Sequence, residues 1–318
     1  MASPALLAVD WGSSSLRAAL LDAQGAVLQQ MAAPRGLLHI AGGTWAAEFD
    51  KLFGPWLARH TGLTTLMCGM VGSRQGWLEA PYAGLPATLN DLAGNLAWVR
   101  PGAVAIVPGL CCKTADQTAD MPDVMRGEET QVFGALRLLG LEQAPQVSLV
   151  LPGTHSKWVQ VRQGRIVGFS THMTGEFYAL LRQQSILARL LPKQEPDFDA
   201  DGFDAGLALA QSPGGLLHHV FGVRTRALLG QREGPWLASH LSGLVLGEEL
   251  RAQDAAGALA PDQPLVLVGG QALTARYRRA LTQRGFAAGS LHQVGDEATW
   301  AGLAGLAALA GRVDLPRR

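Results

Sequence analysis

Charge is scarce in this chain of 318 residues: 26 Lys and Arg balance 26 Asp and Glu, so the formal net charge is zero. A neutral protein has no long-range field that would attract a polyanion, and we therefore expect neither nucleic acid nor an anionic membrane as a general partner. An anionic ligand would have to be held by local groups. Because 48% of the residues are apolar and 16% are charged, the chain can cover a large core, unlike a disordered chain.

Cysteine is also scarce. Cys68, Cys111 and Cys112 are odd in number and form no C-x-x-C pair, which argues against a disulfide framework or a zinc site and predicts a reduced, cytoplasmic location. The first residues lack the basic segment of a signal peptide. The uncharged stretch Ala298–Gly311 has 14 residues, fewer than the roughly 18–20 that cross a bilayer, so we expect a core helix there and no membrane partner.

Several familiar motifs are missing. The sequence has no G-x-x-x-x-G-K-[ST], no G-x-G-x-x-G after a strand, no G-x-S-x-G and no H-E-x-x-H. The P-loop, Rossmann, serine-hydrolase and zincin classes therefore lose their main support.

Glycine, in contrast, is abundant, with 39 residues, and part of it stands in a repeated pattern. Residues 5–31 predict strand, turn, strand, turn and strand, and residues 146–170 predict the same order. In both copies the first turn combines glycine with hydroxyl residues, and the second turn contains a glycine. The copies begin about 140 residues apart, which with the prior of roughly 150 residues per domain predicts two domains with a boundary near Ala144.

The remaining segments alternate between strands and helices, which predicts an α/β fold. Buried strands are expected at 64–71, 103–107, 264–268 and 290–294. Helices are expected at 43–60, 128–140, 174–191, 216–229, 235–253, from the G-G-Q-A-L sequence to about 284, and at 297–311.

Turns of glycine and hydroxyl residues offer N–H and O–H donors, which can bind phosphate without a net positive field. Two such turns could clamp a polyphosphate, and Arg17 and Lys157, each in the strand after its turn, could add positive charge at the transferring group. Asp10 ends the first strand and could hold Mg²⁺ through water. Gly269 and Gly270 would let an adenine approach the backbone closely. A single turn of this kind is more typical of an ordinary hairpin, and it is the repetition that favours phosphate binding.

Five segments together resemble the 2-dehydro-3-deoxygalactonokinase family of the actin, hexokinase and sugar-kinase superfamily. They are DWGSSSLRA (10–18), GMVGSRQGW (69–77), PDVMRGEETQVFGAL (122–136), LPGTHSKWV (151–159) and MTGEFYALL (173–181). The resemblance implies a duplicated ribonuclease H-like, actin-like ATPase fold with domains 1–144 and 145–318 around a central cleft. It also implies transfer of the ATP γ-phosphoryl group to the 6-hydroxyl of 2-dehydro-3-deoxy-D-galactonate, with ATP and Mg²⁺ as cofactors, in galactonate catabolism.

The resemblance also assigns roles to residues that match the family's motifs. Asp10 is assigned to the Mg–ATP region. The first phosphate turn contains Gly12, Ser13 and Ser14, and the second contains Gly153, Thr154, His155 and Ser156. His155 could donate a hydrogen bond there, although a lone histidine more often has a structural role.

The catalytic base of similar sugar kinases is usually an aspartate at the start of a connecting helix, whereas this chain has two glutamates there. We take Glu128 as the base, with Glu129 and Asp123 as substitutes. The alternative is that Glu128 only stabilises the positive end of the helix dipole.

A sugar acid needs a partner for its carboxylate and partners for its hydroxyls. Arg74 can supply the first and Ser73, Gln75 and Trp77 the second; the alternative is a surface loop with a solvated arginine. Thr174 and Glu176 either close over the same cleft or simply begin a helix.

Two other functions stay open at this point. The chain could be a kinase for a related sugar acid or sugar, because the pocket rather than the phosphate turns sets that choice. It could also be a non-catalytic nucleotide- or sugar-sensing module of the same fold. The predicted partners are ATP and a small sugar acid, and the sequence leaves the oligomeric state open.

Overall fold

The computed structural model describes residues 2–112 and 121–311 and divides the chain into two compact units. Unit 1 is drawn from Met1–Leu149, Trp158–Ser170 and Val294–Arg318, and unit 2 from Val150–Lys157 and Thr171–Gln293. The division runs through the strands of the second hairpin, so that each unit takes part of them. The boundary predicted near Ala144 stays a prediction.

The first predicted hairpin is confirmed: three antiparallel strands open the chain and belong to a six-stranded sheet. In sheet order its strands are β3 (Val27–Ala33), β2 (Leu16–Asp22), β1 (Pro4–Trp11), β4 (Thr64–Cys68), β7 (Val104–Ile106) and β6 (Ala97–Arg100). The buried, parallel pair of β1 and β4 forms the middle of the sheet. Helix α1 (Trp45–Arg59) adds Phe49 and Phe53 to the core that contains Trp11 and Leu16.

The second hairpin is confirmed as well. Its strands belong to a five-stranded sheet with the order β12 (Arg165–His172), β11 (Ser156–Arg162), β10 (Val147–Leu151), β13 (Leu265–Val268) and β14 (Leu291–Val294). The first three strands repeat the order of β3, β2 and β1.

Short elements were not predicted because they give no periodic signal over three to six residues. Besides β6, they are β5 (Tyr82–Gly84), β8 (Gly109–Cys112), β9 (Asp123–Met125) and α2 (Leu89–Gly94). The three strands form a small separate sheet in unit 1, in the order β5, β8, β9. Its last strand leads directly into helix α3.

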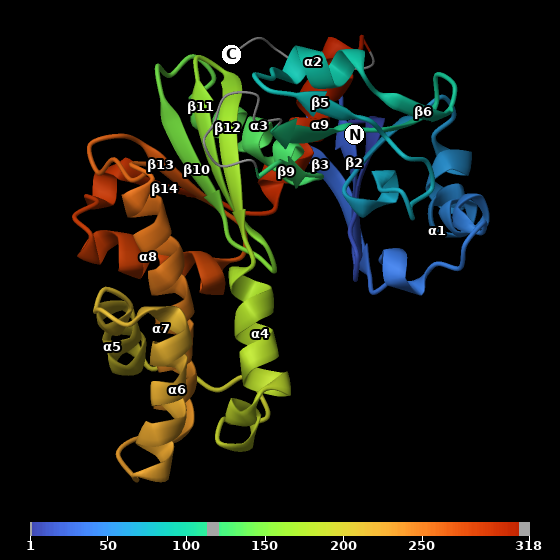
Figure 1. The fold of residues 1–318 in the computed structure, drawn as a ribbon. Helices are drawn as coiled ribbons and strands as arrows, with labels where there is room; N and C mark the ends of the chain where they lie inside the picture. The colour runs from blue at the N-terminus through green and yellow to red at the C-terminus, as the bar shows by residue number, and fades with distance from the viewer. Residues whose placement is uncertain (1, 113–120, 312–318) are drawn as a thin grey trace. The chain divides into compact units, whose positions relative to one another are not determined.

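Unit 2 is rich in helices, and α5, α6 and α7 lie side by side (Figure 1). Its helices are α4 (Thr174–Gln184), α5 (Ala200–Ala210), α6 (Gly215–Leu228), α7 (Gly234–Ala255) and α8 (Gln271–Gln283). The long helix predicted at 174–191 is wrong in its extent: Ser185 is extended, and its hydroxyl accepts the Leu187 N–H (3.1 Å) to start a separate 3-10 turn at Ile186–Arg189. No helix of the described residues is long and apolar enough to cross a membrane.

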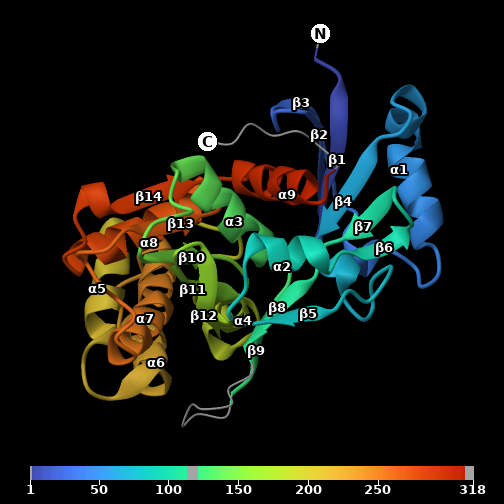
Figure 2. The ribbon, with the colours of Figure 1, turned by 90° about the horizontal axis from the view of Figure 1, so that it is seen from above.

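Helices α3 (Glu128–Leu139) and α9 (Glu297–Leu309) of unit 1 pack backbone against backbone (Figure 2). A β-carbon on Gly134 would overlap the carbonyl of Ala298, and one on Gly302 would overlap the carbonyl of Thr130. Because backbone cannot move aside as a side chain can, both positions require glycine.

We expect Gly302→Ala to lower the free energy of unfolding by about 2 kcal/mol, because overpacking outweighs the roughly 1 kcal/mol that alanine gains in a helix. Urea unfolding of the purified protein measures this. Gly305→Ala is the matched control in the same helix, since its nearest neighbour is only the Leu89 Cδ2 methyl at 3.1 Å. Equal stabilities of the two variants would contradict the backbone contact.

Candidate functional site

The first phosphate turn is held in shape by backbone hydrogen bonds. The Gly12 N–H donates to the carbonyl of Ser15 (3.0 Å), and the Leu37 N–H donates to the carbonyl of Gly12 (2.9 Å). The hydroxyl residues of the turn, Ser13 and Ser14, are exposed. The turn is therefore a preformed loop with its polar groups in solvent.

Asp10 and Arg17 face each other across the β1–β2 pair that this turn connects. Arg17 donates from Nη2 to Asp10 Oδ2 (2.6 Å), and its Nη1 forms an ion pair with Asp296. Burial lowers the pKa of Arg17, but the two carboxylates outweigh it and raise that pKa overall. Arg17, which was predicted to add positive charge at the transferring group, thus lies between two carboxylates.

Two glycines bring the start of α3 close to Asp10. Gly69 follows β4 with φ +91°, and a β-carbon there would lie 2.9 Å from the Trp11 carbonyl oxygen and 3.2 Å from Asp10 Oδ1. Gly127, with φ +108°, precedes α3, and its β-carbon would lie 3.2 Å from the Cα of Gly69. The first turn of α3 is therefore a neighbour of the end of β1, as a site that combines Asp10 with the glutamates requires.

The two glutamates of that turn have different environments. Glu129 is fully buried; its Oε2 accepts the Gly127 N–H (2.7 Å), and its Oε1 accepts the Thr130 hydroxyl (3.1 Å). Burial, followed by the charge of Glu128, raises the pKa of Glu129 to about 7. Glu128 is half-buried, and its Oε2 accepts the Arg126 N–H (3.0 Å).

Asp123, the third predicted acid, begins β9, a whole strand before α3. Its Oδ1 accepts the N–H of the adjacent Val124 (2.7 Å). Of the three acids, Glu128 combines a place in the first turn of α3 with access to solvent.

The predicted sugar-acid loop folds back on itself, because the Trp77 N–H donates to the carbonyl of Val71 (2.8 Å). Arg74 and Gln75 are exposed, whereas Ser73 is buried. Trp77 packs on Phe49 with 5.2 Å between ring centroids, so part of it belongs to the core. The loop thus presents an arginine and an amide and anchors itself with its tryptophan.

Arg126 is a residue of this region that sequence reasoning missed. Its Nη2 donates to the carbonyl of Ala80 (2.8 Å), and its guanidinium lies over Tyr82, 4.3 Å from the ring centroid. A β-carbon on Gly72, in the loop, would lie 3.0 Å from Arg126 Nη1. Arg126 therefore joins the loop to the strand that leads into α3, a link that sequence spacing does not reveal.

In unit 2, the second phosphate turn lies directly against the start of α4. The Glu176 N–H donates to the carbonyl of Thr154 (2.9 Å), and Glu176 Oε2 lies 2.5 Å from His155 Nε2. A β-carbon on Gly175 would overlap the carbonyl of Gly153. Thr174 and Glu176, predicted to bind the sugar acid, are thus neighbours of the phosphate turn.

The last residue of this turn and the residue after it point into the interior. Ser156 is fully buried and donates to Glu249 Oε1 (2.7 Å), and Lys157 is buried with its Nζ donating to the Thr171 hydroxyl (2.7 Å). Gly269, with φ +138°, comes close to the same turn, since its β-carbon would lie 3.7 Å from the Pro152 carbonyl oxygen. Gly270 is the N-cap of α8. The G-G sequence therefore adjoins the second turn, and its predicted contact with an adenine stays a prediction.

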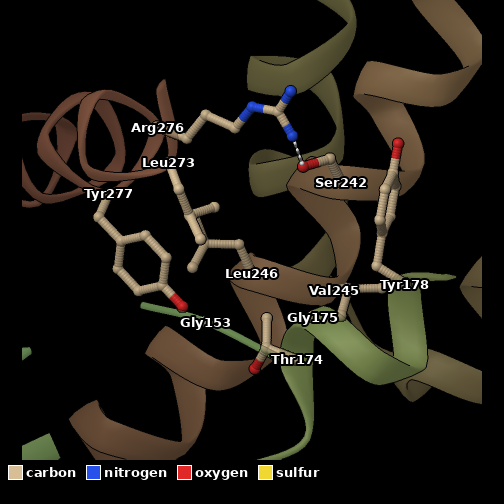
Figure 3. Close-up of a pocket in the computed structure, with 10 residues that line it drawn as sticks. All are labelled: Gly153, Thr174, Gly175, Tyr178, Ser242, Val245, Leu246, Leu273, Arg276 and Tyr277. Atoms are coloured by element: carbon tan, nitrogen blue, oxygen red, sulfur yellow. Dashed lines mark hydrogen bonds between the residues drawn. The ribbon is translucent and has the colours of Figure 1, made fainter. Parts of the chain in front are cut away.

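A pocket opens beside this turn within unit 2 (Figure 3). Helices α7 and α8 supply Val245, Leu246 and Leu273 as apolar walls, and α4 supplies Tyr178. At its rim Arg276 donates to Ser242 Oγ (3.3 Å). The complete lining consists of Gly153, Thr174, Gly175, Tyr178, Ser242, Val245, Leu246, Leu273, Arg276 and Tyr277. An apolar cavity with few polar groups next to a phosphate turn suits a flat heterocycle.

The sequence is similar to known proteins over most of its length. The model of the 2-keto-3-deoxy-galactonokinase family matches residues 10–306. The 2-dehydro-3-deoxygalactonokinase of Escherichia coli K12 is 36% identical over 301 residues, which cover 95% of this chain and 97% of that protein.

Two solved structures are similar to the structure of this chain. A protein of Sinorhizobium meliloti, provisionally assigned as a 2-dehydro-3-deoxygalactonokinase, superposes with a TM-score of 0.83 at 34% identity, covering 95% of this chain and 98% of that one. The activator of 2-hydroxyisocaproyl-CoA dehydratase from Clostridium difficile, with bound ADPNP, has a TM-score of 0.50 at 12% identity, covering 96% and 95%. The predicted α/β, actin-like ATPase fold is confirmed.

The raised pKa of Glu129 predicts a pH-dependent stability. A carboxyl that titrates near 7 when folded and near 4.3 when unfolded holds its proton more tightly in the folded state. The stability that it contributes is complete below the unfolded pKa and is lost as the pH rises through the folded pKa. Wild type should therefore lose on the order of 3 kcal/mol relative to Glu129→Gln between about pH 4 and pH 7.

Urea unfolding of both proteins across that range measures the difference. Parallel pH profiles of the two unfolding free energies would contradict the raised pKa.

Proposed function

This chain belongs to the 2-keto-3-deoxy-galactonokinase family, and we propose that it transfers the ATP γ-phosphoryl group to the 6-hydroxyl of 2-dehydro-3-deoxy-D-galactonate, in galactonate catabolism. The observation that carries the proposal is the family match over residues 10–306, which takes in both phosphate turns, the glutamates of α3 and the pocket of unit 2. The reduced, cytoplasmic location expected from the free cysteines is part of the same proposal.

The pocket of unit 2 is the place for the nucleoside of ATP. Leu246 and Leu273 offer apolar surface to an adenine, and Tyr178 and Arg276 offer a ring and a planar cation that can stack on it. Gly153 belongs both to the pocket and to the second phosphate turn. A nucleoside in the pocket would therefore direct its phosphates to backbone N–H groups of this turn.

Magnesium is the cation that the kinase reaction requires, and the acids of unit 1 fit it. Mg²⁺ prefers one or two carboxylates together with water and substrate phosphates. Asp10 and Asp296, on either side of Arg17, are the residues that would hold it. When bound, the ion neutralises charge on the phosphates.

Glu128 is the general base of this proposal. It is half-buried, in contrast to Glu129, which is enclosed and hydrogen-bonded to its own helix start. A carboxylate that reaches the substrate hydroxyl can take its proton as the oxygen attacks the γ-phosphorus, while ADP leaves with the bridging oxygen. Glu129 then keeps the first turn of α3 in place.

The loop of Ser73, Arg74, Gln75 and Trp77 binds the sugar acid. The exposed Arg74 can form two parallel hydrogen bonds with the substrate carboxylate, and the exposed Gln75 can serve its hydroxyls. Arg126 and Trp77 hold this loop against the rest of unit 1.

The substrate is tested by ADP release in a coupled assay with Mg–ATP and a panel of 2-keto-3-deoxy sugar acids, the parent sugars and water alone. We expect the highest kcat/KM with 2-dehydro-3-deoxy-D-galactonate, because the groups that contact the sugar acid determine which substrate is phosphorylated. A higher value with another acid or sugar would move the assignment to that kinase. ATP binding without any turnover would favour a sensing module.

The base is tested by Glu128→Gln, which should lower kcat by roughly 10²–10⁴-fold with little change in KM. Glu297→Gln is the matched control: Glu297 also lies in the first turn of a helix, and its Oε1 accepts the Gly295 N–H (2.8 Å), two residues before it, as Glu128 accepts from Arg126. The control should keep wild-type kcat. Near-normal kcat in Glu128→Gln, with loss in Glu129→Gln or Asp123→Asn, would refute the assignment.

A further inference from the structure

A buried carboxylate in unit 2, Glu249, lies behind the proposed nucleotide pocket. It belongs to the long helix α7, and only 3% of it is exposed to solvent. Burying a charge costs free energy unless hydrogen bonds compensate for it, so a buried carboxylate needs hydrogen-bond donors around it.

Three hydroxyl groups from three different segments donate to this carboxylate. Ser156, at the end of the second phosphate turn, donates to Oε1 (2.7 Å), and Tyr277 of α8 lies 3.0 Å from both oxygens. The hydroxyl of Thr174, the first residue of α4, donates to Oε2. One carboxylate therefore joins the phosphate turn, α4 and α8 to α7.

The segments that Glu249 joins are the ones that form the pocket. Thr174 and Tyr277 both line it (Figure 3), and Ser156 ends the turn that contributes Gly153. The carboxylate itself is not part of the lining, so it acts through these residues.

The network also engages the hydroxyl groups of the second phosphate turn and of α4. A serine or threonine hydroxyl carries a single proton, and those of Ser156 and Thr174 are directed to Glu249. Neither side chain can then donate to a phosphate at the same time. In this arrangement the second turn binds phosphate with its backbone N–H groups, and its buried hydroxyl fixes the shape of the turn.

We propose that Glu249 is a positioning residue for ATP: it holds the second phosphate turn, the start of α4 and Tyr277 in the arrangement that binds the nucleotide. This role rests on the proposed function, because it requires a nucleotide in the pocket of unit 2. The sugar-acid loop of unit 1 has no part in it.

The test is Glu249→Gln, which keeps the shape of the side chain but replaces one accepting oxygen by a donor. In the full-length protein we expect the Kd for ADP, measured by calorimetry, and the KM for ATP to rise by roughly tenfold, as for loss of a buried charged acceptor. The KM for the sugar acid should stay at its wild-type value. Tyr277→Phe should raise the Kd for ADP less, and adding it to Glu249→Gln should cause little further loss, because both changes remove the same interaction.

Asp204→Asn is the matched control. Asp204 also anchors α8, accepting from Arg279 Nε (2.7 Å) and Nη2 (2.6 Å), but at the surface and away from the pocket. It should bind ADP as wild type does. If Glu249→Gln does not fold, Tyr277→Phe and Thr174→Val provide the same comparison one hydroxyl at a time.

An unchanged Kd for ADP in folded Glu249→Gln would overturn the positioning role, and so would an equal rise in the KM of both substrates. If the proposed function is wrong, the wild-type protein itself will neither bind ADP nor release ADP from ATP. In that case the positioning role of Glu249 is wrong as well. Wild-type binding and turnover together with an unaffected variant would contradict the role of Glu249 alone.

Discussion

Close approach of backbone to backbone, at positions without a β-carbon, is the constraint on which the polar groups of unit 1 and the phosphate turn of unit 2 both depend. In unit 1, Gly69 and Gly127 allow the end of β4 and the start of α3 to meet beside Asp10. In unit 2, Gly175 allows the start of α4 to meet the turn at Gly153. A side chain at these positions would push apart the segments that carry the polar groups. The high glycine content of the chain thus has a structural purpose beyond forming turns.

The phosphate turns of the two hairpins have different surroundings. The first turn is open, with exposed serines, and the charge near it comes from the group of Asp10, Arg17 and Asp296. The second turn is tied to the interior by hydroxyl groups that donate to a buried carboxylate. A neutral protein can therefore handle anions with backbone donors and a few local charges, without a basic surface.

The hairpins, most helices and the place of the glutamates could be predicted, because alternation, glycine turns and helical spacing are local signals. What could not be predicted depends on distant partners. Glu249 lies 93 residues from Ser156 and 75 from Thr174, so no spacing rule connects them. The sequence pair of Glu128 and Glu129 likewise leaves open which one is enclosed, because that depends on packing around the start of α3. Helix α5 was also not predicted.

The central claim, phosphoryl transfer to the terminal hydroxyl of a sugar acid, is tested most directly by identifying the product. The purified protein is incubated with Mg–ATP and 2-dehydro-3-deoxy-D-galactonate, and the mixture is analysed by phosphorus–proton correlation NMR. The account predicts a new phosphomonoester whose phosphorus couples to the two protons on C6, formed in equal amount with ADP. ADP with inorganic phosphate only, or a phosphoester at another carbon, would contradict it.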